Sequence, residues 1–221
     1  MARFTVSKIL FDLDGTLVDS AFDLHAATNH VLTHVGRETV TIEQVRHMVG
    51  FGAKRLIELG LEATGGRDDY DAADLLPVFL DYYRAHIADG TVVFSGGVEM
   101  LKALKAKGFS LAVCTNKPIA LTHPLLQALD IAQFFDAVTG GDSFAFKKPD
   151  PRHLTATAAL LPGDGPFLMV GDSINDIAAA QSAGAPSVAV DFGYTDIPPA
   201  ELGADVLISA LDQLPSLVAY A

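Results

Sequence analysis

The chain has 221 residues, half of them hydrophobic, and a formal net charge of -12. This length allows one large domain, or a main domain with a smaller insertion, around a sizeable core. The negative charge argues against nucleic acid or an anionic membrane surface as a partner, and a single cysteine excludes an internal disulfide. No run approaches the ~18 apolar residues of a membrane span, and the first residues lead directly into a predicted strand, so we expect a cytoplasmic protein.

A predicted strand over residues 6–11 leads into two closely spaced carboxylates. The strand is mostly apolar, and Asp12, Asp14 and Gly15 follow it, with the glycine supplying the turn. Because side chains alternate along a strand, Asp12 and Asp14 can face the same side of the sheet edge. One of them can then attack or bind a metal ion while the other transfers protons. A polar loop with a helix cap nearby explains this segment equally well when it is taken alone.

The next part of the chain, residues 18–89, is predicted to form an inserted helical cap. Two capping boxes mark helix starts, one formed by Ser20 with Asp23 and one by Thr41 with Gln44. Glycines close the first two helices, and apolar faces define the later ones. The expected helices cover residues 20–36, 41–50, about 53–61 and about 71–88.

The segment between the second and third helices is the candidate substrate-binding part of this cap. Gly50 and Gly52 would let the backbone come close to a ligand, and Lys54 or Arg55 would meet a carboxylate there. The alternative interpretation is an ordinary helix end followed by two solvated basic side chains.

From Val98 onward, helices and strands are predicted to alternate. The predicted strands cover residues 110–115, 137–140, 167–171, 187–190 and 206–209, and the helices cover residues 99–107, 124–129, 152–161 and 173–183. Such alternation predicts an α/β fold, a doubly wound parallel sheet with helices on both faces. The catalytic core would comprise residues 1–17 and 90–221.

Three later segments place polar side chains at or near predicted strand ends. These side chains belong to Thr115, Asn116, Lys148, Asp172, Ser173 and Asp176. Each has an ordinary structural explanation when taken singly: a turn, a solvated lysine or a capping box. In an open parallel sheet, however, the carboxyl ends of the strands share one edge where ligands bind. We therefore expect these segments and the first two carboxylates to form one site.

Phosphoryl transfer through an aspartyl phosphate needs this set of side chains. A carboxylate can attack phosphorus only if the negative charges are offset, which calls for a divalent cation and a lysine. Asp12 and Asp172 offer the oxygen ligands that Mg²⁺ takes, and Lys148 offers a fixed positive charge. Thr115 and the backbone amide of Asn116 would hold the phosphoryl oxygens. Asp14 would protonate the leaving alcohol and then deprotonate the attacking water.

The segments resemble the four motifs of the haloacid dehalogenase superfamily of phosphohydrolases. In chain order they are Asp12-x-Asp14-Gly15-Thr16, the strand ending at Thr115, Lys148-Pro149 and Gly171-Asp172-Ser173-x-x-Asp176. The resemblance spans nearly the whole chain and implies a Rossmann-like core with a helical cap. It also implies that Asp12 is the nucleophile and Asp14 the acid/base. Mg²⁺ would be held by Asp12, the backbone carbonyl of Asp14, and Asp172, with Ser173 and Asp176 supporting these ligands.

Within the superfamily, the chain most resembles the phosphoglycolate phosphatases. The stretches that carry this resemblance include Thr115-Asn116-Lys117-Pro118, Gly140-Gly141-Asp142 and Lys147-Lys148-Pro149. They imply a small phosphate ester, 2-phosphoglycolate, as the substrate. We expect a monomer or homodimer. A phosphatase for another small or sugar phosphate, or a β-phosphoglucomutase-like mutase, would use the same residues and remains an alternative. A receiver-like phospho-switch is disfavoured, because it has no acid two residues after its nucleophile and no cap.

Two other signals are weak. His30 and His34 share a helix face but lack the remainder of a zinc motif. Cys114 lacks the arginine that follows the nucleophile of a cysteine phosphatase, since Ala120 stands at that position. We expect Cys114 to be a buried strand residue.

Overall fold

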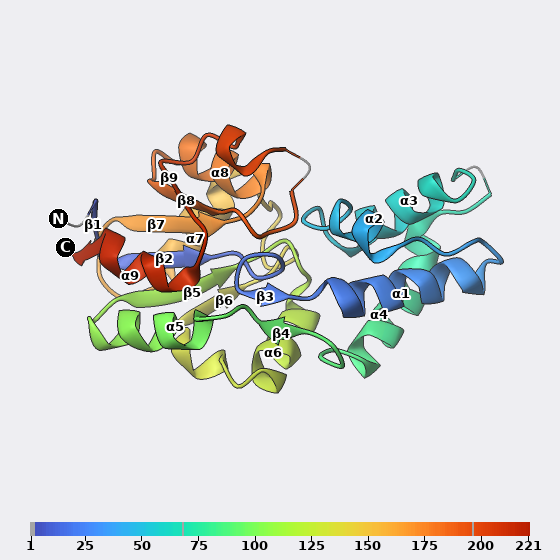
Figure 1. The fold of residues 1–221 in the computed structure, drawn as a ribbon, viewed down its shortest axis with the longest axis horizontal. Helices are drawn as coiled ribbons and strands as arrows, with labels where there is room; N and C mark the ends of the chain where they lie inside the picture. The colour runs from blue at the N-terminus through green and yellow to red at the C-terminus, as the bar shows by residue number, and fades with distance from the viewer. Residues whose placement is uncertain (1–2, 68, 196) are drawn as a thin grey trace.

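The computed structural model describes residues 3–67, 69–195 and 197–221, and its centre is a six-stranded parallel sheet with the strand order β6-β5-β2-β7-β8-β9 (Figure 1). The strands are β1 Phe4–Val6, β2 Lys8–Phe11, β3 Val18–Asp19, β4 Val92–Val93, β5 Ser110–Cys114, β6 Ala137–Thr139, β7 Phe167–Gly171, β8 Ser187–Val190, β9 Val206–Ile208 and β10 Val218–Tyr220. The helices are α1 Ala21–His34, α2 Ile42–Arg46, α3 Ala53–Ala63, α4 Ala72–Ala85, α5 Gly97–Ala106, α6 Ile119–Ala128, α7 Pro151–Ala159, α8 Ile174–Ser182 and α9 Leu214–Leu217, with short 3₁₀ turns at Ala132–Phe134, Pro199–Glu201 and Leu211–Gln213. The predicted doubly wound parallel sheet is confirmed.

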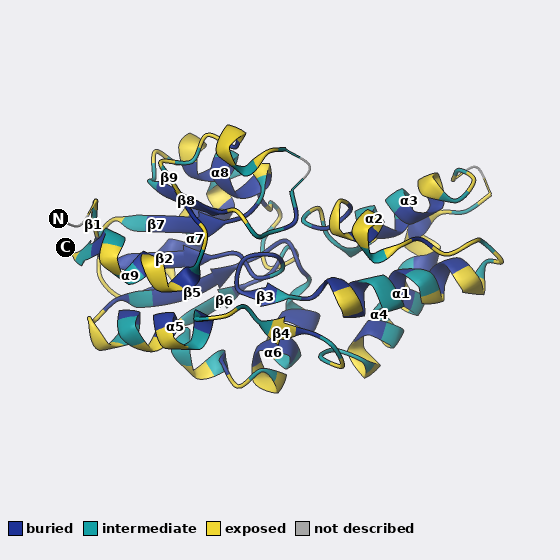
Figure 2. Ribbon diagram, in the orientation of Figure 1, coloured by how far each residue is buried: buried dark blue, intermediate teal, exposed yellow. Residues whose placement is uncertain are grey.

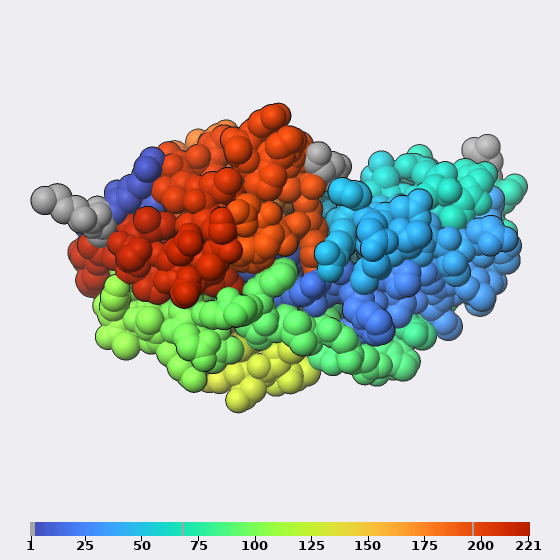
Figure 3. Space-filling model, viewed as in Figure 1, coloured from blue at the N-terminus to red at the C-terminus, as the bar shows by residue number. Residues whose placement is uncertain are grey.

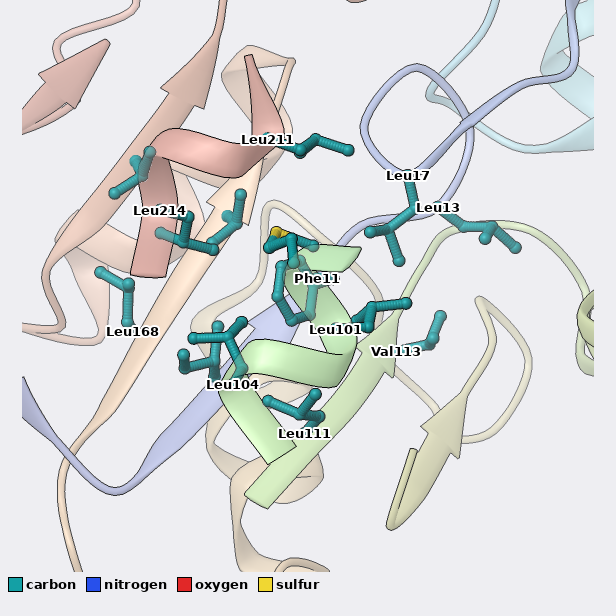
Figure 4. Packing of buried hydrophobic residues seen from close by; sticks show 14 of the residues in the cluster. Phe11, Leu13, Leu17, Leu101, Leu104, Leu111, Val113, Leu168, Leu211 and Leu214 are labelled. Carbon is teal, nitrogen blue, oxygen red and sulfur yellow. The ribbon is translucent and has the colours of Figure 1, made fainter. Parts of the chain in front are cut away.

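The alternation of side chains along the strands divides the core into two layers. In β2, Ile9 and Phe11 are fully buried on the face that packs against α5, α9 and the adjoining 3₁₀ turn (Figure 4). Leu10 points to the opposite face, where it packs with Leu154 of α7 and Ala179 of α8. Because β2 is covered on both faces, its sequence after Lys8 is apolar throughout, as expected of a central parallel strand. This packing fixes the direction in which β2 delivers the residues that follow it.

Helices α1 to α4 pack on one another around a second group of buried residues (Figure 2). In α4 the buried residues Ala72, Leu75, Phe79 and Tyr83 follow a helical period, as predicted from the sequence. The chain enters this part through β3 and leaves it through β4, and these two strands pair antiparallel. The helices form a lobe beside the sheet (Figure 3). The division into domains at residues 18 and 89 stays a prediction.

Several element boundaries differ from expectation. The predicted strand over residues 6–11 is divided at Ser7, since β1 leaves the main sheet to pair with β10. The helix predicted to start at Pro124 begins at Ile119, whose backbone N–H is capped by Asp142. Pro124 lies inside this helix, where it removes one backbone donor without ending it. The second cap helix is also shorter than predicted and ends at Arg46.

One of the two predicted capping boxes is wrong. Ser20 precedes α1 but makes no side-chain cap, because its hydroxyl donates to Asp14. Asp23 instead accepts hydrogen bonds from the returning chain at Gly90 and Thr91. The box formed by Thr41 and Gln44 is present as predicted. No helix of the described residues is long and apolar enough to cross a bilayer.

Candidate active site

The carboxyl ends of β2, β5 and β7, which are neighbours in the sheet, bring the predicted site residues together. The backbone N–H of Asp12 donates to Val170, so strand pairing continues one residue beyond β2 and fixes the position of this carboxylate. In the same way, the backbone N–H of Thr115 donates to the carbonyl of Thr139 in β6. A cavity of about 40 Å³ lies above these ends and is lined by residues of the core and of the helical cap. Its polar lining residues are Asp12, Asp14, Thr115, Asn116 and Lys117, and Gly50 and Gly52 reach it from the cap.

Asp12 is buried and ion-paired. Its Oδ1 lies 3.0 Å from Nζ of Lys148 and accepts the backbone N–H of Leu13 at 2.7 Å. Burial raises the pKa of Asp12 to about 6, although Lys148 acts in the opposite direction. Burial alone would lower the pKa of Lys148, but Asp12 and Asp176 outweigh burial and the pKa is raised. The lysine therefore stays charged beside a carboxylate that has lost most of its contact with water.

Asp12, Asp172 and Asp176 form a buried cluster in which each offers a carboxylate oxygen within 4.8 Å of the others. Burial raises the pKa of Asp172 to about 8, and the negative charges of Asp176 and Asp12 add to this rise. One lysine cannot neutralise three carboxylates, so the cluster suits a divalent cation with a preference for oxygen ligands.

The carboxylate of Asp172 is held by two hydrogen bonds and closely flanked by two glycines. Thr16 donates to its Oδ1 at 2.8 Å, and the backbone N–H of Tyr194 donates to its Oδ2 at 2.7 Å. A Cβ added at Gly15 would come within 2.3 Å of Asp172, and one added at Gly193 within 2.2 Å. The chain thus holds this carboxylate in one orientation toward the cluster, as expected of a metal ligand.

Asp176 supports the site from the first turn of α8. It accepts hydrogen bonds from the backbone and hydroxyl of Ser173 within a capping box, so the structural alternative considered for this residue holds alongside its place in the cluster. Its other oxygen accepts from Lys148 at 2.6 Å. Asp176 therefore orients Lys148 as well as capping the helix.

Asp14 has partners that the sequence analysis did not identify. Nζ of Lys117 lies 3.1 Å from both carboxylate oxygens of Asp14 and 2.8 Å from the hydroxyl of Tyr83. Ser20 donates to the same carboxylate at 2.6 Å. Lys117 directly follows the strand-end pair Thr115-Asn116, and this position could have marked it as a site residue. Tyr83 carried no such signal, because it falls on the apolar face predicted for α4.

Side chains of the core donate hydrogen bonds to the loop before α3 and hold it at the sheet edge. Asn116 and Asn175 donate their side-chain amides to the backbone carbonyl of Gly50 at 3.0 and 3.3 Å. Nζ of Lys147 donates to the neighbouring carbonyl of Phe51 at 2.9 Å. Gly50 and Gly52 therefore lie over the cavity.

Lys54 and Arg55 are not brought into this cavity. They line a neighbouring cavity of about 280 Å³. The guanidinium of Arg55 is engaged by Glu58 at 3.0 Å and Glu62 at 3.1 Å within its own part of the cap. The structure thus separates both basic residues from the carboxylates at the strand ends.

Cys114 and His30, the two weaker signals of the sequence, have structural roles in the fold and take no part in the candidate site. Cys114 is buried in β5, and burial raises the pKa of its thiol to about 11, which is unsuitable for a nucleophile. His30 stacks on Tyr82 with ring centroids 4.3 Å apart. Within the described parts of the chain, the aspartate cluster is the one group arranged to hold a metal ion.

Comparison with known proteins identifies the family. Residues 9–190 match the model of the haloacid dehalogenase-like hydrolases. The chain belongs to this family. It is also 45% identical over 211 residues to a phosphoglycolate phosphatase of Caulobacter vibrioides, covering 95% of this chain and 89% of that protein.

Solved haloacid dehalogenase-like structures share the architecture along nearly the whole chain. A crystal structure described as a predicted phosphoglycolate phosphatase from Haemophilus somnus superposes with a TM-score of 0.86 at 33% identity and covers 97% of both chains. CbbY from Rhodobacter sphaeroides, solved in complex with xylulose-(1,5)bisphosphate, superposes with a TM-score of 0.79 at 25% identity, covering 95% of this chain and 96% of that one. The predicted family is confirmed, and so is the prediction of a phosphoric monoester hydrolase.

Proposed function

We propose that this hydrolase is a Mg²⁺-dependent phosphatase that converts 2-phosphoglycolate to glycolate and phosphate through a phosphorylated Asp12. The observation that carries the proposal is the ion pair between buried Asp12 and Lys148 at the floor of a cavity that also contains Asp14. The similarity to curated phosphoglycolate phosphatases supports the choice of substrate. A cytoplasmic location and a monomer or homodimer remain predictions.

Mg²⁺ would be held by Asp12, the backbone carbonyl of Asp14, and Asp172. When bound, it would supply positive charge against the phosphoryl oxygens and keep the buried carboxylates ionised. Thr115 and the backbone amide of Asn116 would position the phosphoryl group opposite these acids. The placement of Asp12, Asp14, Thr115 and Asn116 around the cavity, and of Asp12 and Asp172 in the aspartate cluster, supports these roles.

The reaction would proceed in two displacements at phosphorus. A carboxylate oxygen of Asp12 forms a bond to phosphorus while the bond to the ester oxygen breaks, and Asp14 donates a proton to the departing alkoxide. Water then attacks phosphorus, Asp14 takes a proton from it, and the bond between phosphorus and Asp12 breaks. Lys148 offsets the charge on Asp12 throughout. Asp176 keeps the lysine in place by a 2.6 Å contact.

Trapping the intermediate tests this mechanism. Enzyme mixed with 2-phosphoglycolate and Mg²⁺, quenched in acid and digested, should yield a phosphorylated peptide that contains Asp12. Asp12→Asn should abolish both the modified peptide and turnover, while Asp14→Asn should slow turnover by at least ~100-fold. Unimpaired turnover by Asp12→Asn would refute the mechanism. Exhaustive chelation should silence the wild type, and added Mg²⁺ should restore it.

A sugar-phosphate phosphatase or a mutase remains the second candidate, because the structural relative CbbY binds a sugar bisphosphate. The same residues would serve in a mutase, but the phosphoryl group would return to an organic hydroxyl instead of to water. Measuring free phosphate against total substrate consumed separates these functions. A phosphatase releases one phosphate for each ester bond broken.

A further inference from the structure

Lys117 is a buried cation inside the catalytic cavity. Its side chain is 3% exposed and follows Thr115 and Asn116 at the end of β5. Its ammonium group contacts Asp14 and the hydroxyl of Tyr83, and it also lies 4.4 Å from the centre of the Tyr83 ring. The buried ammonium group is therefore paired with a carboxylate, as a buried charge requires.

Among the described residues that line this cavity, Lys117 alone carries a cationic side chain. Lys148 lies beneath the cavity, where Asp12 and Asp176 already share its charge. A substrate with a second negative group, beyond its phosphate, needs a positive partner once it is enclosed. Lys117 is in the right place to be that partner.

The donors of Lys117 leave capacity for a ligand. An ammonium group has three N–H bonds. Tyr83 can take one, and the two carboxylate oxygens of Asp14, both 3.1 Å from Nζ, can share a second. That arrangement leaves the third N–H for a ligand carboxylate. Burial raises the pKa of Tyr83 to about 12, so the phenol stays neutral and holds the ammonium without competing as an anion.

The remaining cavity wall indicates what else the substrate carries. Its cap-side residues are mostly apolar, namely Leu24, Val49, Leu56 and Phe79, and Leu121 adds to them from the core. Hydroxyl groups of a sugar would meet these side chains without hydrogen-bond partners, which is unfavourable. A short ester with one extra anionic group and no free hydroxyls avoids this cost. The cavity volume of about 40 Å³ also favours a small ligand.

We propose that Lys117, held by Tyr83, binds the carboxylate of the substrate and is the residue that selects small carboxylated phosphate esters. This inference rests on the proposed phosphatase function and names the specificity residue of the same site. It replaces Arg55 and Lys54 as candidates for that role, because Arg55 is paired with Glu58 and Glu62 and both basic residues line another cavity.

The test compares 2-phosphoglycolate with ethyl phosphate, which is similar in size but has no carboxylate. The wild type should show the higher kcat/KM for 2-phosphoglycolate. Lys117→Gln should reduce this preference by at least ~10-fold, the loss expected when a charged hydrogen bond is removed. Tyr83→Phe retains the ring and the lysine, and it should reduce the preference by a smaller factor. Lys102→Gln, a change at an exposed position on α5, is the control and should leave the preference unchanged.

Binding measurements separate recognition from catalysis. In the inactive Asp12→Asn background with Mg²⁺ present, adding Lys117→Gln should weaken binding of 2-phosphoglycolate by at least ~10-fold and binding of ethyl phosphate much less. Equal losses for both esters would mean that Lys117 acts only by positioning Asp14, and would overturn its role in selection. A loss of preference in Arg55→Gln but not in Lys117→Gln would also overturn it.

The outcome distinguishes the inference from the function on which it rests. If the wild type prefers 2-phosphoglycolate and Lys117→Gln retains that preference, only the role of Lys117 is wrong. If the wild type hydrolyses a sugar phosphate in preference to both small esters, the proposed substrate class is wrong and the inference falls with it.

Discussion

We expect the buried Asp172 to make the stability of the metal-free fold depend on pH. Its pKa is raised from 3.8 to about 8 by burial and by the neighbouring acids. Between these values the folded protein keeps a proton that the unfolded chain releases. The contribution of this proton to stability is fully present below the unfolded pKa, and it is lost as the pH rises through the folded pKa. The metal-free protein should therefore become less stable from weakly acidic to weakly basic pH.

Mg²⁺ should reverse this trend, because the ion displaces the proton from the same carboxylates. We expect the rise in Tm produced by Mg²⁺, relative to chelator, to be larger at about pH 8 than at about pH 5. Asp172→Asn should remove most of the rise, whereas Asp164→Asn, at an exposed loop position, should retain it. Thermal unfolding with and without Mg²⁺ measures the effect. A rise that is equal at both pH values would contradict the assignment of these acids as ligands.

Gly15 offers a further test of the cluster, because the backbone strain of a substitution there can be distinguished from its clash with Asp172. Its φ is +83°, and an added Cβ would come within 2.3 Å of Asp172. Gly163 has a similar φ of +77° with nothing within 4 Å of an added Cβ. Both alanine variants carry backbone strain of roughly 1 kcal/mol, but only Gly15→Ala also crowds Asp172, the proposed metal ligand. We expect Gly15→Ala to lose nearly all activity and Gly163→Ala to keep it at a temperature where both are folded. Comparable activity in the two variants would show that the clash is relieved without moving Asp172.

At the scale of the elements, the connection between the cap and the core depends on Asp23. This buried carboxylate in α1 accepts hydrogen bonds from the backbone of Gly90 and from the backbone and hydroxyl of Thr91. It therefore ties the start of the cap to the segment that leads into β4. The paired strands β3 and β4 lie beside it. A side chain that would ordinarily cap its own helix serves a long-range contact instead.

Asp23→Asn should destabilise the protein by roughly 1–3 kcal/mol, because the new NH₂ group would face backbone donors in a buried site. Asp71→Asn is the matched control, since Asp71 caps the exposed start of α4 and asparagine caps a helix nearly as well. Urea unfolding should show a clear fall in midpoint for the first variant and little change for the second. If both midpoints stay near that of the wild type, the connection does not depend on Asp23.

The elements also show what the sequence could reveal. Asp12, Thr115 and Asp172 were predictable because each follows an apolar strand, and the ends of parallel strands meet at one edge. The roles of Tyr83 and Asp23 were not, because each depends on a contact with a residue more than thirty positions away. The division of the first strand had a similar cause. The partner of β1 is β10 at the other end of the chain, and nothing local to Ser7 indicates that pairing.

At the scale of the whole molecule, access to the site depends on how the cap meets the core. Three donors from three segments of the core hold two successive carbonyls of the cap loop, at Gly50 and Phe51. The cavity beneath them is small, so we expect the loop to move when substrate enters and product leaves. Of the three donors, Lys147 is the most exposed, and it can be altered with the least disturbance of the site.

Lys147→Met keeps the aliphatic stem but removes the bond to Phe51, so it should favour the open arrangement. Because this bond is exposed to solvent, we expect a loss of ~0.5–1 kcal/mol, which corresponds to a two- to five-fold rise in KM. The value of kcat should fall little, and it should rise if product release limits turnover. Lys102→Met, at an exposed position on α5, should change neither constant. Steady-state kinetics with 2-phosphoglycolate measures both. A fall in kcat at unchanged KM would mean that Lys147 acts on the chemical step, and that the bond to Phe51 does not control closure.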